Sequence, residues 1–272
     1  MKKIRLFGLV ALSLVLFSCQ PGSNDNNDPE PPTNVQHGNI GDVICIGGYY
    51  YKITNNFQPY TVELEREGYT SQSNAAKKIV SATNADGAYT GEVVIPTSID
   101  YDGVKFAVTS IGESAFYNKN VKSIYIPGCV ERIGMNAFRM CYNMENMTLC
   151  NGIKKIESHA FSGCRKCTTI TIPGSVEQMG ECAFEECYYW TRLNIESGVK
   201  QIGYAAFERR NYPTSKSYVY CYSTEPPTIT SKGSNCEAFT ITNCELYVPK
   251  GTASVYKKTA GWKNFSTIRE MN

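Results

Sequence analysis

A short motif that recurs at a nearly constant spacing constrains the fold of this chain more than any other feature. Five segments share an apolar residue, three variable residues and then Ala-Phe, and they begin at Ile111, Ile133, Ile156, Met179 and Ile202. Their phenylalanines lie at positions 116, 138, 161, 184 and 207, so the period is 22 residues once and 23 residues thereafter. A fixed period of this length predicts a solenoid in which each repeat forms one coil and stacks on the next.

A second apolar pattern follows each Ala-Phe pair. Its spacing is that of an L-x-x-L-x-L strand, and a shorter apolar pair comes before the next motif. Because these residues recur at the same register in every coil, they are expected to stack into one continuous core. The strand positions are Val121, Ile124, Ile126, Met144, Met147, Leu149, Cys167, Ile170, Ile172, Trp190, Leu193 and Ile195.

These motifs resemble those of the BspA-like leucine-rich-repeat proteins, a family found on microbial cell surfaces. The resemblance rests on the five Ala-Phe segments and on Ile-Tyr-Ile-Pro at 124–127 and Ile-Thr-Ile-Pro at 170–173. It departs at Cys150 and Glu196, where proline is missing, and at 209–216, where residues are inserted. The expected fold is a leucine-rich-repeat solenoid, β-rich with 22–23-residue coils, a β-hairpin N-terminal cap and a short helical C-terminal cap.

The N-terminal segment predicts export. Residues 1–18 combine a basic start with an apolar run too short to span a bilayer, which indicates a lipoprotein signal peptide. Leu16-Phe17-Ser18-Cys19 resembles the lipobox of bacterial lipoproteins, which implies cleavage before Cys19 and its acylation. The alternative is an ordinary signal peptide followed by a chance cysteine. Residues 19–38, rich in Asn, Asp and Pro, are predicted to be a disordered tether.

The remaining chain divides into a β-rich N-terminal cap at 39–107, leucine-rich repeats at 108–249 and a C-terminal cap at 250–272. In the first cap, residues 43–46 and 49–53 predict one hairpin, and residues 93–95 and 104–108 predict a second around Asp102-Gly103. An independent ligand-binding β-domain is the alternative interpretation of this region. Ala238-Phe239 is a sixth block, and residues 252–259 predict a helix with Thr252 as N-cap, followed by Trp262, Phe265 and Ile268 folding over the last coil.

The chain contains 12 cysteines, which in an exported protein raises the question of disulfides. Cys141, Cys164 and Cys187 each lie three residues after their Phe, so we expect small, reduced core residues. Stacked neighbours about 5 Å apart would also permit bridges, so that alternative stays open. Cys164-x-x-Cys167 lacks a second cysteine pair or a nearby histidine, and no metal site is predicted.

Nothing in the sequence predicts catalysis. His159 is one of only 2 histidines, and its place before Ala-Phe is held in the other coils by Ser, Asn, Cys or Ala. A nucleophile elbow, a P-loop, an HExxH motif and a dinucleotide fingerprint are all missing. We therefore expect no enzymatic activity and no cofactor. The net charge of +2 gives no reason to expect nucleic acid, and membrane contact is expected only through the lipid anchor.

The exposed face of the repeat strands is the candidate binding site, because leucine-rich repeats use this face for recognition. Side chains between apolar strand positions point outward. They form two neighbouring columns along the stack: Tyr125, Thr148, Thr171, Asn194, Tyr220 and Tyr247 in one, and Ser123, Asn146, Thr169, Arg192, Tyr218 and Glu245 in the other. The candidate binding residues are Tyr125, Thr148, Thr171, Arg192, Asn194, Tyr218, Tyr220 and Tyr222. The family resemblance implies adhesion to a protein, host extracellular-matrix protein being one candidate, and lipid anchoring to the outer membrane at the cell surface. A glycan is the alternative ligand, since Tyr, Asn and Thr on a flat sheet suit sugars. Thr and Tyr also simply favour exposed strands.

Overall fold

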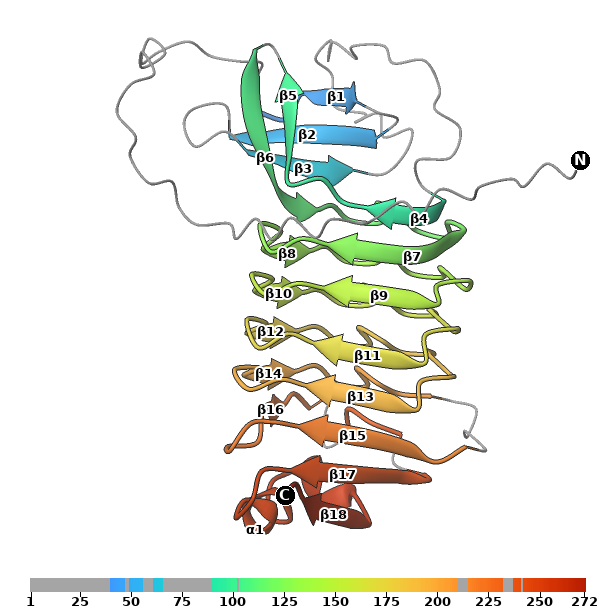
Figure 1. Cartoon of the computed structure of the whole chain (residues 1–272), viewed down its shortest axis with the longest axis vertical. Coiled ribbons are helices and arrows are strands. Elements are labelled where there is room, and N and C mark those ends of the chain that lie inside the picture. Colours follow the sequence, from blue (N-terminus) through green and yellow to red (C-terminus); the bar gives the residue numbers. More distant parts are fainter. Residues whose placement is uncertain are drawn as a thin grey trace, which may run out of the picture.

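The computed structural model describes residues 40–46, 49–55, 61–65, 90–101, 103–209, 215–231, 237–240 and 242–272. The predicted signal peptide, Cys19 and the tether to residue 38 lie outside the described residues. Within those residues the predicted solenoid is confirmed: the coils stack as successive rungs along the long axis of the molecule (Figure 1). No helix in this part of the chain is long and apolar enough to cross a membrane.

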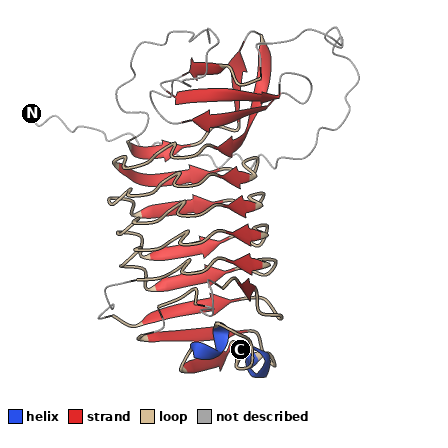
Figure 2. Cartoon of the chain, turned by 180° about the vertical axis from the view of Figure 1, so that it is seen from behind, coloured by secondary structure: helices blue, strands red, loops and turns tan. Residues whose placement is uncertain are grey.

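Each coil contributes one longer strand to one side of the stack and a two-residue strand to the other (Figures 1 and 2). The longer strands are β7 (Val121–Ile126), β9 (Asn146–Leu149), β11 (Thr169–Ile172), β13 (Arg192–Ile195), β15 (Ser217–Cys221) and β17 (Cys244–Val248). The short ones are β8 (Arg132–Ile133), β10 (Lys155–Ile156), β12 (Gln178–Met179), β14 (Gln201–Ile202) and β16 (Thr228–Ile229). Neighbouring rungs pair in parallel, which places equivalent residues of successive coils beside one another.

Six N-terminal strands lie within the described residues, and five of them extend the sheet of short strands. The six are β1 (Val43–Ile46), β2 (Tyr49–Asn55), β3 (Thr61–Glu65), β4 (Gly91–Val94), β5 (Ser98–Tyr101) and β6 (Val104–Ile111). The predicted first hairpin is present as β1 and β2, and β3 pairs in parallel with β6. The second predicted hairpin was wrong in one arm: β6 pairs with β5, whereas β4 joins β7 in another sheet. Pro96 directly follows the predicted hairpin arm at 93–95. Because proline has no N–H to donate to a strand ladder, the chain leaves the sheet of β4 and β7 before it turns.

A buried ion cluster joins the N-terminal strands to the first coils. Glu63 on β3 accepts a hydrogen bond from the Ser110 hydroxyl (2.9 Å) and pairs with Arg132 of β8. Lys52 on β2 lies 2.8 Å from Glu65 and 3.5 Å from Glu63. Burial acts to raise the pKa of Glu63, but Arg132, Ser110 and Lys52 outweigh it and lower that pKa. Burial raises the pKa of Glu65 despite its bond to Lys52.

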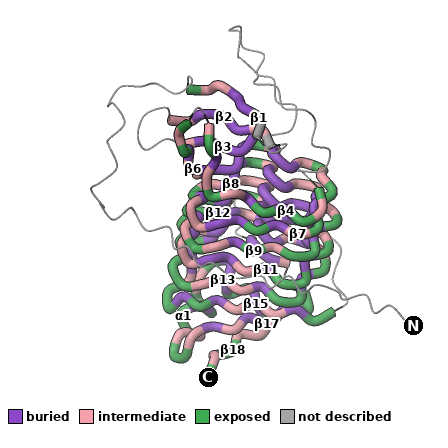
Figure 3. Tube along the Cα trace, turned by 45° about the horizontal axis from the view of Figure 1, so that its top comes forward, coloured by how far each residue is buried: buried purple, intermediate pink, exposed green. Residues whose placement is uncertain are grey.

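A column of stacked phenylalanines runs through the core. Successive ring centroids are 4.8 to 5.4 Å apart with interplanar angles of 3° to 12°, and every ring is buried. The column comprises Phe116, Phe138, Phe161, Phe184, Phe207 and Phe239, so the sixth predicted block is confirmed. Figure 3 shows buried segments recurring from rung to rung along the same axis.

The turn that carries each Ala-Phe pair has left-handed backbone geometry. The residue directly before Ala has φ between 55° and 57° in five coils: Ser114, Asn136, His159, Cys182 and Ala205. Such angles are uncommon for residues other than Gly. Hydrogen bonds between rungs stabilise them here; the His159 N–H donates to the Glu181 carbonyl (3.0 Å) and the Cys182 N–H to the Tyr204 carbonyl (2.9 Å). The variable position is therefore a rigid corner.

Nine cysteines whose side chains the structure describes are free thiols, and most of them are buried. Each cysteine three residues after a Phe donates to the Phe carbonyl of the preceding coil. The pairs are Cys141 to Phe116 (3.1 Å), Cys164 to Phe138 (3.4 Å) and Cys187 to Phe161 (3.3 Å). Burial raises the pKa of the Cys141 thiol to about 12. The expected reduced ladder is thus what these residues form.

The C-terminal cap differs from its prediction in two respects. The helix α1 (Ala253–Tyr256) is shorter than 252–259, and the Thr252 hydroxyl donates to the Pro249 carbonyl (2.7 Å) instead of accepting from the first turn. Beyond the 3-10 helix η1 (Trp262–Asn264), an unpredicted strand, β18 (Thr267–Glu270), pairs with β17. As predicted, Trp262 and Phe265 cover the last ring of the column, 5.1 and 5.3 Å from Phe239.

Candidate functional site

The longer strands form two separate sheets. One contains β4, β7 and β9, and the other contains β11, β13, β15, β17 and β18. The predicted outward columns coincide with the strand register of the second sheet: Thr171, Asn194, Tyr220 and Tyr247 are aligned, as are Thr169, Arg192, Tyr218 and Glu245. Of the candidate residues, Tyr125 and Thr148 lie on the first sheet, whereas the other six lie on or directly beside the second.

Arg192 is at the centre of the second sheet's outer face. Its Nε donates to Asn194 Oδ1 (3.0 Å), and Asn194 Nδ2 donates to Thr171 Oγ1 (3.0 Å). The Arg192 guanidinium carbon lies 4.0 Å from the centroid of the Tyr220 ring, which is cation–π geometry. These contacts hold four of the candidate side chains in one arrangement across β11, β13 and β15.

A tyrosine cluster continues this arrangement toward the C-terminal cap. The rings of Tyr220 and Tyr247 stack with centroids 4.9 Å apart, and Tyr218 lies 6.2 Å from Tyr247 in a tilted orientation. The Tyr247 hydroxyl donates to Glu245 Oε2 (3.1 Å). Burial, followed by this carboxylate, raises the pKa of Tyr247. The phenol is therefore neutral at physiological pH and keeps its hydrogen.

Glu245 is held by two cations at the edge of the cluster. Lys216 Nζ lies 2.7 Å from Glu245 Oε1, and Arg269 Nε lies 3.3 Å from Glu245 Oε2. The hydrogen bond from Lys216 is the main cause that lowers the pKa of this carboxyl. Sequence reasoning placed Glu245 and Tyr247 in the outward columns but missed Lys216 and Arg269. Arg269 could not be found because the strand that carries it was not predicted.

A shallow depression of about 440 Å³ adjoins Arg192. Its lining residues are Thr171, Arg192, Asn194, Glu196, Ser197 and Tyr222. Tyr222 follows the end of β15 and has 38% of its surface exposed. Four candidate residues thus surround one concavity whose rim is rich in hydrogen-bonding groups. Their assignment as a binding site stays a prediction.

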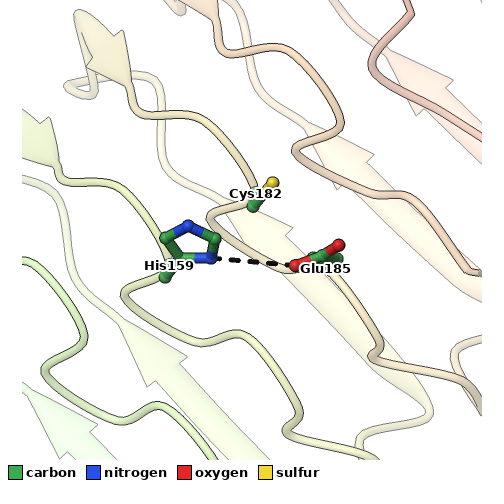
Figure 4. Close-up of side chains that lie close together, drawn as sticks. All are labelled: His159, Cys182 and Glu185. Atoms are coloured by element: carbon green, nitrogen blue, oxygen red, sulfur yellow. Dashed lines mark ion pairs between the residues drawn. The ribbon is translucent and has the colours of Figure 1, made fainter.

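A second group of candidate side chains lies outside the longer strands, at and beside the left-handed corners. One ligand atom each from His159, Cys182 and Glu185 all lie within 4.8 Å of one another (Figure 4). Nothing in the sequence indicated this group, because Cys182 and Glu185 are 23 and 26 residues from His159 and meet it only when coils stack. Cys164 and Cys167, in contrast, are both buried and donate to backbone carbonyls of the core.

Comparison with known proteins agrees with the register of the stack. The model of the BspA type leucine rich repeat region matches residues 109–224 in six copies. Residues 109–224 therefore consist of BspA type leucine-rich repeats. The resemblance noted in the sequence is thereby confirmed, and the repeat region so defined includes β11, β13 and β15 of the candidate face.

Solved structures of bacterial leucine-rich-repeat proteins are similar to this chain. A leucine-rich repeat protein from Bacteroides capillosus has 26% identity and a TM-score of 0.43, over 57% of this chain and 98% of that chain. A leucine rich cell surface protein from Faecalibacterium prausnitzii has 20% identity and a TM-score of 0.45, over 77% of this chain and 57% of that one. No curated protein matches the sequence.

Proposed function

We propose that this protein is a recognition module that binds a protein partner through the outer face of β11, β13, β15 and β17. The observation that carries the proposal is the ordered cluster of Arg192, Tyr220 and Tyr247 on that face. Tyr and Arg are the residue types that most often anchor protein interfaces. A cluster already held by stacking and hydrogen bonds loses less side-chain entropy when it binds.

The proposal includes attachment to a membrane at the bacterial surface. It is supported by the lipobox-like Leu16-Phe17-Ser18-Cys19 and the polar, proline-containing segment that follows. Acylation at Cys19 would anchor the chain stably, since each buried methylene contributes about 0.8 kcal/mol and several acyl chains act together. The recognition face would then be displayed by a tether, with host extracellular-matrix protein as one class of partner. A non-enzymatic role is part of the same proposal.

A glycan is the second candidate ligand, and a specific feature favours it. The depression next to Arg192 is lined by Thr171, Asn194 and Ser197, with the exposed Tyr222 at its edge. Hydroxyl and amide groups beside an aromatic ring suit a sugar, which offers both hydroxyls and an apolar face.

The test is a binding comparison between the purified chain and a double variant, Tyr218→Ala with Tyr220→Ala, against matrix proteins and a glycan array. We expect the double variant to weaken protein binding by at least about 30-fold, since a hot-spot residue contributes about 2 kcal/mol or more. Tyr125→Ala is the matched control, because Tyr125 is a 43% exposed tyrosine on the other sheet. Thermal melts of all three proteins should coincide.

Other outcomes have definite meanings. Binding to glycans but not to proteins would replace the first proposal by the second. Equal binding by the wild type and the double variant would place the partner elsewhere on the chain. No binding to either panel would contradict both and would direct attention to a structural role or to a partner in the same membrane.

A further inference from the structure

The group formed by His159, Cys182 and Glu185 lies away from the proposed recognition face, on the arc of turns that carries the Ala-Phe pairs. His159 and Cys182 occupy the same corner position in consecutive coils, and Glu185 directly follows Phe184. His159 Nδ1 is 3.7 Å from Glu185 Oε2. The three side chains converge on one another across two rungs (Figure 4).

The backbone at both corners is held by the stack. The His159 N–H donates to Glu181 and the Cys182 N–H to Tyr204, so each corner is bonded to the coil below it. Glu185 is 7% exposed, whereas His159 and Cys182 are half-buried. The three residues are therefore held by rigid elements, which is what a functional site requires, and two of them are partly exposed to solvent.

We propose that His159, Cys182 and Glu185 together bind one divalent transition-metal ion of the zinc type. Imidazole nitrogen, thiolate sulfur and carboxylate oxygen are the ligands that zinc takes in proteins, with bonds of about 2.0 to 2.3 Å. Ligand atoms around a tetrahedral ion are then about 3.3 to 3.8 Å apart. Because the three ligand atoms already lie within 4.8 Å of one another, side-chain rotations that move each atom by about 1 Å complete the site.

The electrostatic surroundings favour a cation at this position. The carboxylates of Glu185, Glu208 and Glu181 place negative charge around the Cys182 thiol. The same negative charges attract a divalent ion, which would take the place of the thiol proton. Three protein ligands leave one coordination position for water or for an external ligand, as in open zinc sites.

The repeat itself supplies substitutions that the fold accepts. The corner position holds Asn136 and Ala205 in the coils that flank these two, with the same left-handed φ. His159→Asn and Cys182→Ala therefore remove a metal ligand and leave a residue that another coil already carries. Cys150→Ser is the control, since Cys150 is a half-buried thiol outside the group, at a position where another coil has Glu196.

The experiment titrates the purified, reduced full chain with Co²⁺ and then displaces Co²⁺ with Zn²⁺. We expect one equivalent of Co²⁺ to produce a thiolate-to-cobalt charge-transfer band that Zn²⁺ abolishes, and Zn²⁺ to raise the melting temperature. His159→Asn and Cys182→Ala should each weaken affinity by more than the roughly 10–100-fold that follows loss of an outer-shell partner. Cys150→Ser should bind as the wild type does.

Two results would overturn the proposal. One is a wild-type protein that gives no charge-transfer band and no Zn²⁺-dependent shift in melting temperature. The other is a band that persists in Cys182→Ala and is lost in Cys150→Ser, which would assign the bound metal to other thiols. The wild-type melt without metal should match those of both ligand variants, so that lost binding cannot be attributed to unfolding.

Discussion

Truncation of Phe161 tests whether the ring column carries the stability of the stack. This side chain is fully buried, and its ring stacks on Phe138 at 5.0 Å and on Phe184 at 4.9 Å. Phe→Ala in a core destabilises a protein by about 3–5 kcal/mol. We expect the upper part of that range, about 4–5 kcal/mol, because two ring contacts are lost along with the buried area.

Urea unfolding, monitored by circular dichroism, measures the change in the free energy of unfolding. Phe161→Leu is the matched control: it keeps most of the volume but loses the ring stacking, so its loss should be about 1–1.5 kcal/mol. Coils of a solenoid contact only their neighbours, so the deleted ring should also weaken coupling between the two halves of the stack. Hydrogen exchange at the Phe161 amide, which donates to the Ala183 carbonyl at 2.7 Å, should therefore speed up before the whole chain unfolds.

A loss below about 1 kcal/mol for Phe161→Ala, with an unchanged urea slope, would refute the reasoning. It would mean that the strand residues alone sustain the core. Equal losses for the Ala and Leu variants would instead assign the stability to ring stacking and not to filled volume.

Two further predictions follow from the close approach of the coils and from the N-terminal ion cluster. Gly152→Ala should destabilise the protein by more than about 2 kcal/mol, because a Cβ there would lie 1.8 Å from the Gly128 carbonyl oxygen. Gly251→Ala is the control: Gly251 also has a positive φ but lies in open space, so this variant should lose only about 1–2 kcal/mol. Equal urea midpoints for the two variants would contradict this prediction. Glu63 has a lowered pKa, so its stabilisation is present above its ordinary value of 4.5 and is lost as the pH falls through the lowered value. Glu63→Gln should accordingly destabilise the protein at pH 7 and have no effect on its stability in strong acid. The comparison is made in a Glu65→Gln background, because the raised pKa of Glu65 changes stability with pH in the opposite direction.

The solenoid could be predicted well because each repeat is visible within a short stretch of the sequence. The first five Phe of the column, the strand triplets after the first four of them and the cysteines three residues after Phe follow the same 22–23-residue repeat, so one alignment predicts most of the stack. Where that periodicity ends, prediction weakened. The cap strand Thr267–Glu270 pairs with β17 at an offset of 22 residues, but it was missed because Ile268 is its only apolar residue.

Arg209 illustrates a different limit. In the sequence it begins the insertion at 209–216, and nothing there indicates a core position. In the structure it is 1% exposed, its guanidinium lies 3.9 Å from the Trp190 ring, and Nη1 donates to the Trp190 carbonyl. A buried arginine depends on a specific aromatic and carbonyl environment that only tertiary packing creates, so local sequence could not indicate it.

The candidate sites show the same division between periodic and non-periodic information. The outward columns on the strands could be listed from the sequence, since alternation on a strand fixes which residues point outward. Their grouping around Arg192 could not be listed, because it depends on which neighbouring side chains contact one another. The metal-ligand group was missed because each member looks ordinary in its own coil.

The internal variation of the repeat explains where function can reside in such a chain. Positions that the stack constrains scarcely vary between coils: Ala and Phe recur because each must fill the same space against its neighbour. The left-handed corner is constrained only in its backbone, so it carries Ser, Asn, His, Cys or Ala. The outward strand positions are constrained only to be exposed. Chemistry can therefore enter at these positions without loss of stability, and both proposed sites combine such residues from adjacent rungs.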